Sequence, residues 1–497
     1  MSNLGEQFRG LESVQFSSEE AHVLFIPETL QLFLLSPAGA AALDGIRQGK
    51  PLAEAASEGG YDPGALEGFV HHLIAEVGKA PSAARARAGA TAEEYIGPVL
   101  PKLVFMVNNF CNLRCTYCYE HATVFKEPAT TMTRELVDSA LERFHAAFRG
   151  CAELMFIGGE PTLSESIIEY ACLRAAEISR ERGVEISFSM ITNGVRMTEK
   201  MFEIIDRFGV QVTFSMDGPQ KVHDSERLRQ DGSGSYDLMM KNVRRYQEKH
   251  ADKLGVECTL THAQARRGVT VSDLSRFFAD ELDVSAPHIA AAGLVAGDLL
   301  NPFTNQPTRL ENEFEQAAGT AMDELFLHLE APDAQIGKRA GLDLVSGMVK
   351  RLMRRQSALE MCPAGTSQLV VDSHGDVYPC WMFAGMPAFR MGNVTRDPVF
   401  NDVARKVLQR IIENDKRRNP QCSVCYARYA CNACLGNNQN STGLLERIDE
   451  NYCNTIRGTL RTVVLKLGEA KADKARWEAI RGGAGRSADL RKEHCPC

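Results

Sequence analysis

The sequence lacks the features of several large protein classes. It has no uninterrupted apolar run of about 18 residues, the length that a membrane-spanning helix needs, so we expect no transmembrane segment. The stretch from Met1 to Phe8 has neither a basic region nor an apolar core, so no secretory signal is expected. Positive charge is not in excess either, since the formal net charge is −8, which argues against a general nucleic-acid-binding protein. These absences favour a cytoplasmic protein with no membrane or nucleic-acid partner.

Cysteine, in contrast, is abundant. The chain has 15 cysteines in 497 residues. In a reducing compartment such a set is more often metal-binding or catalytic than disulfide-bonded. The composition, 44% hydrophobic and 24% charged, is that of a globular chain long enough for several domains. The positions of the cysteines therefore carry the most information.

The first group of cysteines is Cys111, Cys115 and Cys118, spaced C-x3-C-x2-C. It follows the apolar run Leu103–Val107, which predicts a buried strand, so the cysteines lie on the loop after that strand. Thiolates this close together select zinc, Cu(I) or an iron–sulfur cluster. Three thiolates would leave one iron of a four-iron cluster open to a small molecule. A zinc ion with a fourth ligand from elsewhere is the alternative, although structural zinc prefers four protein ligands.

Strand and helix patterns alternate between residues 100 and 330. This alternation predicts an α/β fold with a parallel sheet and crossover helices. Six such units suit a partial (β/α)6 barrel, in which active-site groups gather at the carboxyl ends of the strands. The candidate strands are Leu103–Phe110, Leu154–Ile157, Ile186–Ile191, Val210–Ser215, Val256–Leu260 and Pro287–Ala291.

Polar motifs follow the candidate strands at their carboxyl ends. Gly158-Gly-Glu160-Pro follows the second strand, and its glycines let the backbone approach a ligand closely, while its carboxylate can accept hydrogen bonds from an ammonium group. Asn193 follows the third strand. The fourth strand is followed by Ser215-Met-Asp217-Gly-Pro. The residues Asp, Gly and Pro are also favoured in tight turns. The alternative to a catalytic role for Asp217 is therefore that its side chain caps a turn.

With these motifs the chain resembles the radical S-adenosylmethionine (SAM) enzymes, whose C-x3-C-x2-C motif has an aromatic residue before the last cysteine, here Tyr117. The resemblance implies a [4Fe–4S] cluster on Cys111, Cys115 and Cys118, with SAM chelating the open iron. Reductive cleavage of SAM then gives a 5′-deoxyadenosyl radical that abstracts a substrate hydrogen. In some members an aspartate at the place of Asp217 acts as a base on the substrate. The SAM-binding residues implied are Tyr117, Gly158, Gly159, Glu160, Pro161, Asn193 and Ser215.

A second group of cysteines lies between residues 362 and 453 and resembles the SPASM extension of radical SAM enzymes, with its seven cysteines and two auxiliary four-iron clusters. The motif departs from the family at its last spacing, which is x2 between Cys431 and Cys434 where x3 is usual. The nearer cluster has only three cysteines, so its fourth iron is open or another residue completes it. Zinc is the alternative for this block taken alone. The implied ligands are Cys362, Cys380 and Cys434 for the nearer cluster and Cys422, Cys425, Cys431 and Cys453 for the distal one.

The N-terminal residues 1–78 predict a small α+β domain. Ala21–Ile26 and Leu30–Leu35 read as a hairpin, and three short helices follow. A hairpin with three helices resembles the PqqD-like recognition domain of peptide-modifying enzymes, in which an extended leader peptide adds to the edge strand. A winged-helix-like accessory domain without a ligand is the alternative.

The remaining segments carry little chemistry. Cys151, Cys172 and Cys258 are expected to be buried core residues, and the sequence assigns no role to Cys495 or Cys497. The expected order is an N-terminal domain at 1–78, a linker at 79–99, the barrel at 100–330, bridging helices at 331–361, the SPASM domain at 362–455, and a C-terminal helix with a tail at 456–497.

Three functions account for these features to different degrees. The favoured one is a radical SAM peptide maturase with three [4Fe–4S] clusters, which cross-links a precursor peptide and takes electrons from a flavodoxin or ferredoxin. A thioether product is favoured over a carbon–carbon bond, because a peptide cysteine could bind the open nearer cluster. The second is an anaerobic sulfatase maturase, which forms formylglycine but generally lacks the N-terminal domain. The third, a non-catalytic zinc or redox-sensing protein, explains the cysteines but not the strand-end motifs.

Overall fold

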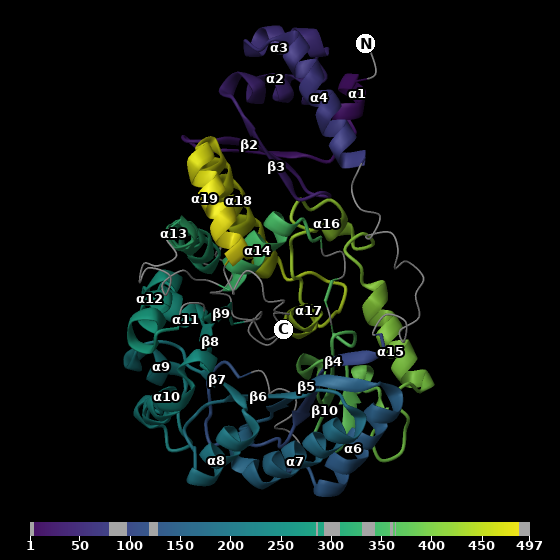
Figure 1. Ribbon diagram of the computed structural model, residues 1–497, viewed down its shortest axis with the longest axis vertical. Coiled ribbons are helices and arrows are strands. Elements are labelled where there is room, and N and C mark those ends of the chain that lie inside the picture. Colours follow the sequence, from purple (N-terminus) through teal and green to yellow (C-terminus); the bar gives the residue numbers. More distant parts are fainter. Residues whose placement is uncertain are drawn as a thin grey trace.

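The barrel sheet is the largest element of the computed structural model (Figure 1). The structure describes residues 4–78, 97–118, 128–284, 287–292, 309–330, 343–357, 361–362 and 364–486. Most of the expected linker and the tail with Cys495 and Cys497 lie outside these ranges.

Nine strands form the barrel sheet in the order β12-β11-β10-β4-β5-β6-β7-β8-β9. From β4 to β9 each strand pairs in parallel with the next one along the chain. The predicted α/β class and the six predicted strands are confirmed, with small shifts at their ends. Their bounds are Val99–Met106 (β4), Gly150–Ile157 (β5), Ser187–Thr192 (β6), Gln211–Ser215 (β7), Gly255–Leu260 (β8) and His288–Ala291 (β9).

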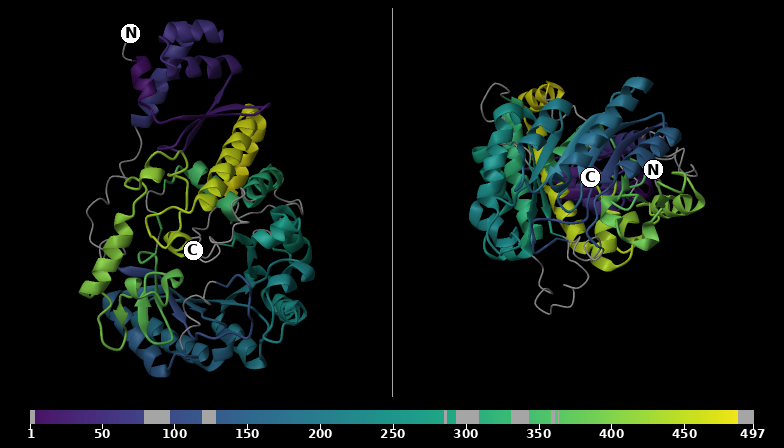
Figure 2. Two further views of the ribbon diagram at one scale, coloured as in Figure 1. Left: turned by 180° about the vertical axis from the view of Figure 1, so that it is seen from behind. Right: turned by 90° about the horizontal axis from the view of Figure 1, so that it is seen from below.

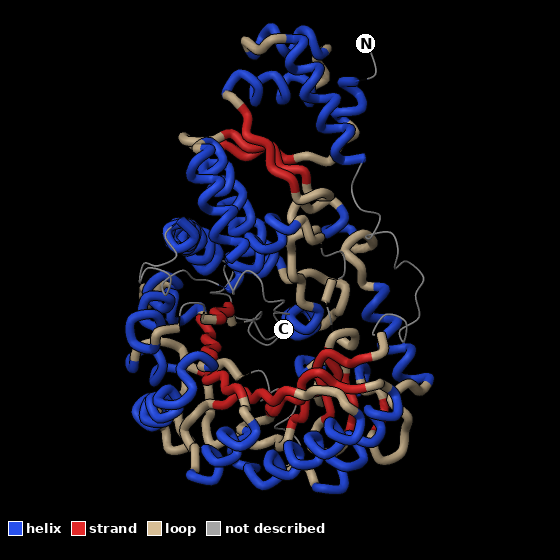
Figure 3. Tube along the Cα trace, viewed as in Figure 1, coloured by secondary structure: helices blue, strands red, loops and turns tan. Residues whose placement is uncertain are grey.

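The helices between these strands cover the outer, convex side of the curved sheet (Figure 3). Their ends follow local sequence rules. Threonine side chains cap the first turns, as Thr133 accepts a hydrogen bond from the Leu136 amide and Thr198 from the Met201 amide. The helices are Arg134–Ala147 (α6), Glu165–Arg182 (α7), Glu199–Phe208 (α8), Gln220–Glu226 (α9), Tyr236–His250 (α10), His262–Arg266 (α11) and Val271–Leu282 (α12).

The C-terminal cysteine-rich region extends the same sheet, which the sequence did not predict. Strand β10, Gln368–Val371, pairs in parallel with β4, and β11, Asp376–Tyr378, and β12, Gly392–Asn393, continue the sheet in antiparallel fashion. Cys380 lies two residues after the end of β11. The second cysteine group is therefore built onto the barrel edge next to the strand that precedes the first group.

Residues 4–78 form a three-stranded antiparallel sheet in the order β1-β2-β3 with helices on one face. The predicted hairpin and three helices are confirmed, whereas the first helix and first strand were not predicted. The elements are Leu4–Arg9 (α1), Val14–Ser17 (β1), His22–Ile26 (β2), Gln31–Leu35 (β3), Pro37–Arg47 (α2), Leu52–Gly59 (α3) and Pro63–Gly78 (α4).

Strand β2 belongs to two hydrophobic cores at once. Its side chains alternate, so that Leu24 and Ile26 pack among the N-terminal helices while Val23 and Phe25 join the main core of the molecule. The main-core face lies against a long C-terminal helix, α18, Glu450–Ala472, which contacts all three strands (Figures 1 and 2). The N-terminal domain is therefore attached through a shared apolar interface.

Further helices connect this interface to the barrel. The expected C-terminal helix is found as α18 and begins before residue 456, and one of the described helices, Asp343–Arg354, lies in the range expected for the bridging helices. None of the described helices is both long and apolar enough to cross a membrane. The remaining helices are Arg309–Glu330 (α13), Asp343–Arg354 (α14), Asp402–Glu413 (α15), Pro420–Ser423 (α16), Leu435–Thr442 (α17) and Lys474–Arg486 (α19).

Helix α18 lies close to β2 at Gly468. A Cβ atom there would lie 2.2 Å from a methyl carbon of Val23, well inside normal contact distance. We expect Gly468→Ala to push the helix from the sheet and lower the free energy of unfolding by about 1–3 kcal/mol, the usual range for overpacking. Urea unfolding would measure the effect. Gly347→Ala on α14 is the matched control, because a Cβ there has nothing within 4 Å. Equal stability of the two variants would contradict the interface.

Candidate functional site

The first cysteine group lies on the loop after β4, residues 107–118, which we call the thiol loop. Its backbone is hydrogen-bonded to the segment after β5. The amide of Gly159 donates to the Asn108 carbonyl at 3.1 Å, and the amide of Glu160 donates to the Phe110 carbonyl at 3.0 Å. The Asn108 side-chain amide donates in turn to the Glu160 carbonyl at 2.8 Å. The two strand-end motifs thus form one unit.

The two glycines are required by this contact. A Cβ on Gly158 would lie 2.6 Å from the Asn108 carbonyl oxygen, and one on Gly159 would lie 2.3 Å from the Phe110 carbonyl oxygen. Gly158 also has φ of +151°, which favours glycine. The sequence suggested that these glycines let the backbone approach a ligand. In the structure the backbone that lies against them is that of the thiol loop.

The carboxylate of Glu160 joins the ends of β5 and β6. It is buried; one oxygen accepts from the Thr162 hydroxyl and the Thr192 hydroxyl, both at 2.6 Å, and the other accepts from the Asn193 amide at 2.7 Å. Burial raises the pKa of Glu160, and these hydrogen bonds oppose the rise. Glu160 therefore holds the strand-end loops in place.

Asn193 and Gln230 fix the thiol loop from two sides. The Asn193 side chain donates to the Asn112 side-chain oxygen at 2.8 Å and to the sulfur of Cys111 at 3.6 Å. The Gln230 side chain donates to the carbonyl oxygen of Leu113 at 3.0 Å. Of these, only Asn193 was predicted from the sequence. Gln230 belongs to no strand-end motif, so nothing in its local sequence identified it.

The three thiols of the loop lie near one another. Burial raises the pKa of the Cys111 thiol, and the charges of Glu160, Cys115 and Cys118 raise it further. Burial also raises the pKa of Cys115, but the Arg227 guanidinium lowers it. A bound metal centre would require thiolates, so Arg227 acts in the direction that favours binding.

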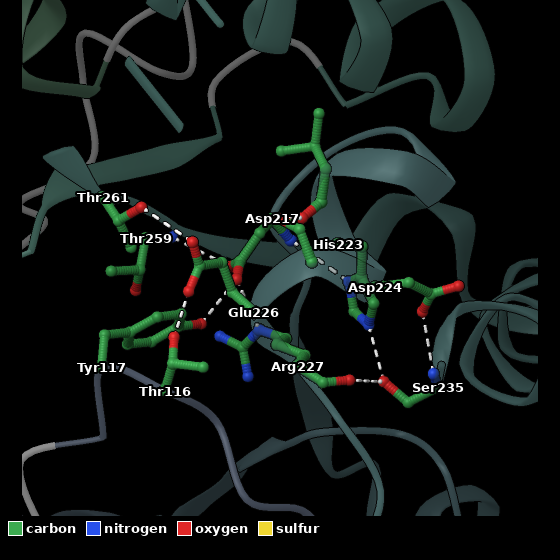
Figure 4. A network of polar contacts seen from close by, with 12 residues as sticks. Thr116, Tyr117, Asp217, His223, Asp224, Glu226, Arg227, Ser235, Thr259 and Thr261 are labelled. Carbon is green, nitrogen blue, oxygen red and sulfur yellow. Dashed lines mark hydrogen bonds and ion pairs between the residues drawn. The ribbon is translucent and has the colours of Figure 1, made fainter. Parts of the chain in front are cut away.

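A buried ion pair lies beneath the thiol loop (Figure 4). Asp217 is fully buried; one carboxylate oxygen lies 3.0 Å from the Arg227 Nε and accepts a hydrogen bond from the Tyr117 hydroxyl at 2.6 Å. Its other oxygen accepts from the Thr259 amide at 3.1 Å. The Arg227 guanidinium also lies 5.4 Å from the centre of the Tyr117 ring. Tyr117, Asp217 and Arg227 therefore connect the thiol loop to β7, α9 and β8.

The contacts of Asp217 argue against the catalytic role considered from the sequence. Both carboxylate oxygens already accept hydrogen bonds or pair with a cation. A structural role for Asp217 is therefore favoured over that of a base acting on a substrate. Neighbouring residues extend the network, since Glu226 accepts hydrogen bonds from the hydroxyls of Thr116 and Thr261. Asp224 accepts hydrogen bonds from the Ser235 and Tyr236 amides at the start of α10 and so caps that helix.

The other expected SAM contacts lie at the same edge of the sheet. Ser215 ends β7, and Pro161 begins the short turn after β5. All seven residues expected to bind SAM thus lie at or after the carboxyl ends of β4, β5, β6 and β7. Their contacts with SAM remain a prediction.

The second cysteine group divides into two sets. Burial raises the pKa of Cys380, and the nearby thiols of Cys362 and Cys434 raise it further. The other set lines one cavity together with Cys434. Because Cys434 lies near both sets, the division of these cysteines between two clusters stays a prediction. Thiol-only donor sets fit the soft ligands that iron–sulfur clusters take. The cavity-lining set is Cys422, Cys425, Cys431 and Cys453.

The remaining described cysteines are core residues, as expected. Cys151, Cys172 and Cys258 are buried in the main core, and burial raises the pKa of Cys151 to about 12. Within the described ranges, no group of three or more His, Cys, Asp or Glu side chains is arranged to hold a single metal ion.

Two family models match this chain. The radical SAM superfamily matches residues 105–262, and the SPASM iron-sulfur cluster-binding domain matches residues 362–426. The cysteine-type anaerobic sulfatase-maturating enzyme of Clostridium perfringens (strain 13 / Type A) is 23% identical over 361 residues, 69% of this chain and 92% of that protein. Mycofactocin maturase MftC of Mycobacterium tuberculosis (strain CDC 1551 / Oshkosh) is 26% identical over 301 residues, 59% of this chain and 67% of that protein.

A similar solved structure is that of native anSMEcpe with bound AdoMet, which is SAM, and the Cp18Cys peptide. It has a TM-score of 0.59 and 20% sequence identity, and the match covers 75% of this chain and 99% of that chain. The similarity shows a shared fold.

The ion pair beneath the thiol loop can be tested by a double-mutant cycle. Arg227→Met would leave the buried Asp217 carboxylate unpaired and lower the free energy of unfolding by about 3–5 kcal/mol. Adding Asp217→Asn, which removes the charge but can still accept from Thr259, should recover part of that loss. Denaturant unfolding of the single and double variants measures the coupling. Strictly additive losses would mean that the two charges do not stabilise each other.

Proposed function

We propose that this chain, a radical SAM enzyme with a SPASM domain, modifies a ribosomally made peptide through hydrogen abstraction by a 5′-deoxyadenosyl radical. The observation that carries the proposal is the convergence of Cys111, Cys115 and Cys118 with the strand-end motifs at one edge of the barrel, within the range that matches the radical SAM superfamily. The product that we favour is an intramolecular cross-link, with a thioether preferred to a carbon–carbon bond.

The residues of the thiol loop have distinct roles in this proposal. Cys111, Cys115 and Cys118 would hold a [4Fe–4S] cluster, which supplies the electron for SAM cleavage when it is bound. Asn193 and Gln230 would hold the loop in place through their hydrogen bonds to Asn112 and Leu113. The strand-end residues Tyr117, Gly158, Gly159, Glu160, Pro161, Asn193 and Ser215 would surround SAM.

The two later cysteine sets would hold auxiliary clusters, for three [4Fe–4S] clusters in all. The three-membered set leaves one iron for a thiolate of the substrate, which is our reason for preferring the thioether product. A flavodoxin or ferredoxin would be the electron donor.

A peptide substrate is supported by the relatives and by the N-terminal domain. The relatives named above are maturases, and the solved structure of anSMEcpe contains a peptide. In this chain, β3 pairs only with β2 among the described strands, so its other edge has no strand partner there. One backbone carbonyl of β3, that of Leu32, accepts a hydrogen bond from the Lys471 ammonium group at 2.8 Å, which a docked peptide would leave in place or displace. We propose that a leader peptide adds to this edge, as in PqqD-like domains.

The second candidate is an anaerobic sulfatase maturase. It is favoured by the match to the Clostridium perfringens enzyme, which spans 92% of that protein. The N-terminal domain separates the two candidates, because a leader-docking surface has no use in an enzyme that recognises a sulfatase. A gene for a short peptide beside this one would support the first candidate, and a sulfatase gene would support the second.

The cofactor assignment predicts the iron content of the anaerobically reconstituted protein. Three clusters give about twelve irons per chain, and Cys115→Ala should reduce this to about eight and abolish SAM cleavage. Cys172→Ala, in the buried core, is the matched control and should keep both. Tightly bound zinc without labile sulfide in the wild-type protein would refute both the maturase and the sulfatase candidates.

The leader-docking proposal predicts a local effect on β3. Leu34 is 41% exposed on this strand, and Leu34→Asp would replace an apolar contact with a charge. We expect about tenfold weaker binding of a precursor peptide, or ~1.4 kcal/mol, with unchanged SAM cleavage. Leu238→Asp on α10 is the control, because Leu238 is 42% exposed outside this domain. Fluorescence anisotropy with the labelled precursor measures binding, and equal affinity of both variants would argue against docking at β3.

A further inference from the structure

Strand β3 has a different environment on each of its two faces. Phe33 and Leu35 pack against the N-terminal helices, whereas Leu32 packs against the main core, on the side of α18 (Figures 1 and 2). Successive side chains of a strand point to opposite faces, and residues directly opposite each other in paired strands share a face. The side chains of a peptide strand added to β3 would therefore point alternately toward α4 and toward α18.

The face toward α4 is aromatic. The Phe33 ring lies edge-on to the Phe69 ring of α4, with 5.9 Å between the ring centres, and the centre of the His72 ring lies 6.0 Å from that of Phe33. At the start of the strand, the Gln31 side chain donates a hydrogen bond to the Glu76 carboxylate at 3.1 Å. A peptide side chain on this face would lie beside rings, so an apolar residue fits it.

The opposite face of β3 is next to a cation, Lys471, from the last turn of α18. Its ammonium group donates to the backbone carbonyl oxygen of Leu32 at 2.8 Å and lies 5.7 Å from the centre of the Trp477 ring of α19. Lys471 is partly buried, and within the described ranges no ion pair joins it to a carboxylate. A carbonyl and a ring thus hold its charge at β3, and an anionic partner would stabilise it further.

Two further cations lie near Lys471. Burial lowers the pKa of Lys471, and the charges of Arg355, just after α14, and of Arg481, in α19, lower it further. The neighbouring carboxylates already have partners, since Glu478 lies 3.6 Å from the Arg481 guanidinium and Asp473 accepts from the amides at the start of α19. This side of β3 therefore favours a negatively charged peptide residue.

We propose that the segment of a precursor peptide that adds to β3 carries an acidic side chain that pairs with Lys471, next to an apolar residue that faces Phe69. The inference deepens the proposed function, because it requires a peptide strand on β3. A peptide amide that donates to the Leu32 carbonyl would take the place of the Lys471 ammonium group. The ammonium group would then donate to the peptide carboxylate, and such a charge-assisted hydrogen bond is stronger than one to a neutral carbonyl.

A lysine at a sheet edge can also have the opposite function, because proteins place lysine there to prevent the addition of another strand. Leu34, which is 41% exposed on the same strand, favours binding, since an edge protected from pairing is not expected to expose a large apolar side chain. The two functions predict opposite results. Removal of a protecting charge should strengthen the binding of every extended peptide, whereas removal of a binding charge should weaken the binding of acidic peptides alone.

The test measures the binding of short fluorescein-labelled synthetic peptides to the full-length protein by fluorescence anisotropy. One peptide alternates valine with glutamate, and the others replace glutamate by glutamine or by lysine. The wild-type protein should bind the glutamate peptide about tenfold more tightly than the glutamine peptide, and the lysine peptide most weakly. Lys471→Gln, which can still donate to the Leu32 carbonyl, should bind the glutamate and glutamine peptides equally, whereas Lys471→Arg should retain the preference.

Lys474→Gln is the matched control, because it removes the same charge from an exposed side chain on α19 and should leave the preference intact. Circular dichroism checks the folding of each variant. Arg481→Gln, also at an exposed position, provides a second variant should Lys471→Gln fail to fold, and it should reduce the preference in part.

Equal affinity of the wild-type protein for all the peptides, or an unchanged preference in the folded Lys471 variant, overturns the inference. Tighter binding of every peptide to Lys471→Gln would also overturn it and would assign edge protection to this lysine. A wild-type protein that binds none of the peptides would instead refute docking on β3, on which the inference rests. Binding needs neither iron nor SAM, so failure of the enzyme assignment would show separately, in the iron content and in SAM cleavage.

Discussion

The backbone contact between the thiol loop and the glycines after β5 is the constraint on which the rest of the site depends. Without side chains at Gly158 and Gly159, Asn108 and Phe110 can lie directly on the neighbouring strand-end loop. That contact determines where the first cysteine stands, and Glu160, whose carboxylate links β5 to β6, is part of the same unit. The contact therefore holds the start of the thiol loop at the carboxyl edge of the sheet.

Buried charged side chains lie next to both cysteine groups, but their partners differ between the two. Under the thiol loop, Arg227 is balanced by Asp217, and the pair joins elements that are far apart in sequence. At the cavity lined by Cys422, Cys425, Cys431, Cys434 and Cys453, Lys416 is part of the wall and donates to the Cys431 carbonyl oxygen, while the charge of the thiols depends on what they bind. The first arrangement gives rigidity, whereas the second makes the site responsive to the charge of its occupant. The low dielectric of the interior strengthens both effects.

The sequence predicted the parts of the fold that depend on local patterns. Six strands were located correctly because continuous apolar runs and alternating helices leave clear periodic signals. The extension of the sheet by β10 to β12 was not predicted, because these strands are short and their pairing with β4 joins residues more than 250 positions apart. In the site, the thiols and strand-end motifs were found by spacing, while Glu226, Gln230 and Lys416 were not, since their importance arises from contacts across the fold.

Strand β2 is shared between two hydrophobic cores, and this has a consequence for substrates. Because Val23 and Phe25 belong to the main core, the N-terminal domain is held at a set distance from the barrel and does not move on a free tether. A peptide docked on β3 would then reach the barrel only with a spacer of suitable length. The fold would thus act as a ruler: residues would be selected for modification by how far they lie from the recognised segment, as well as by their chemistry.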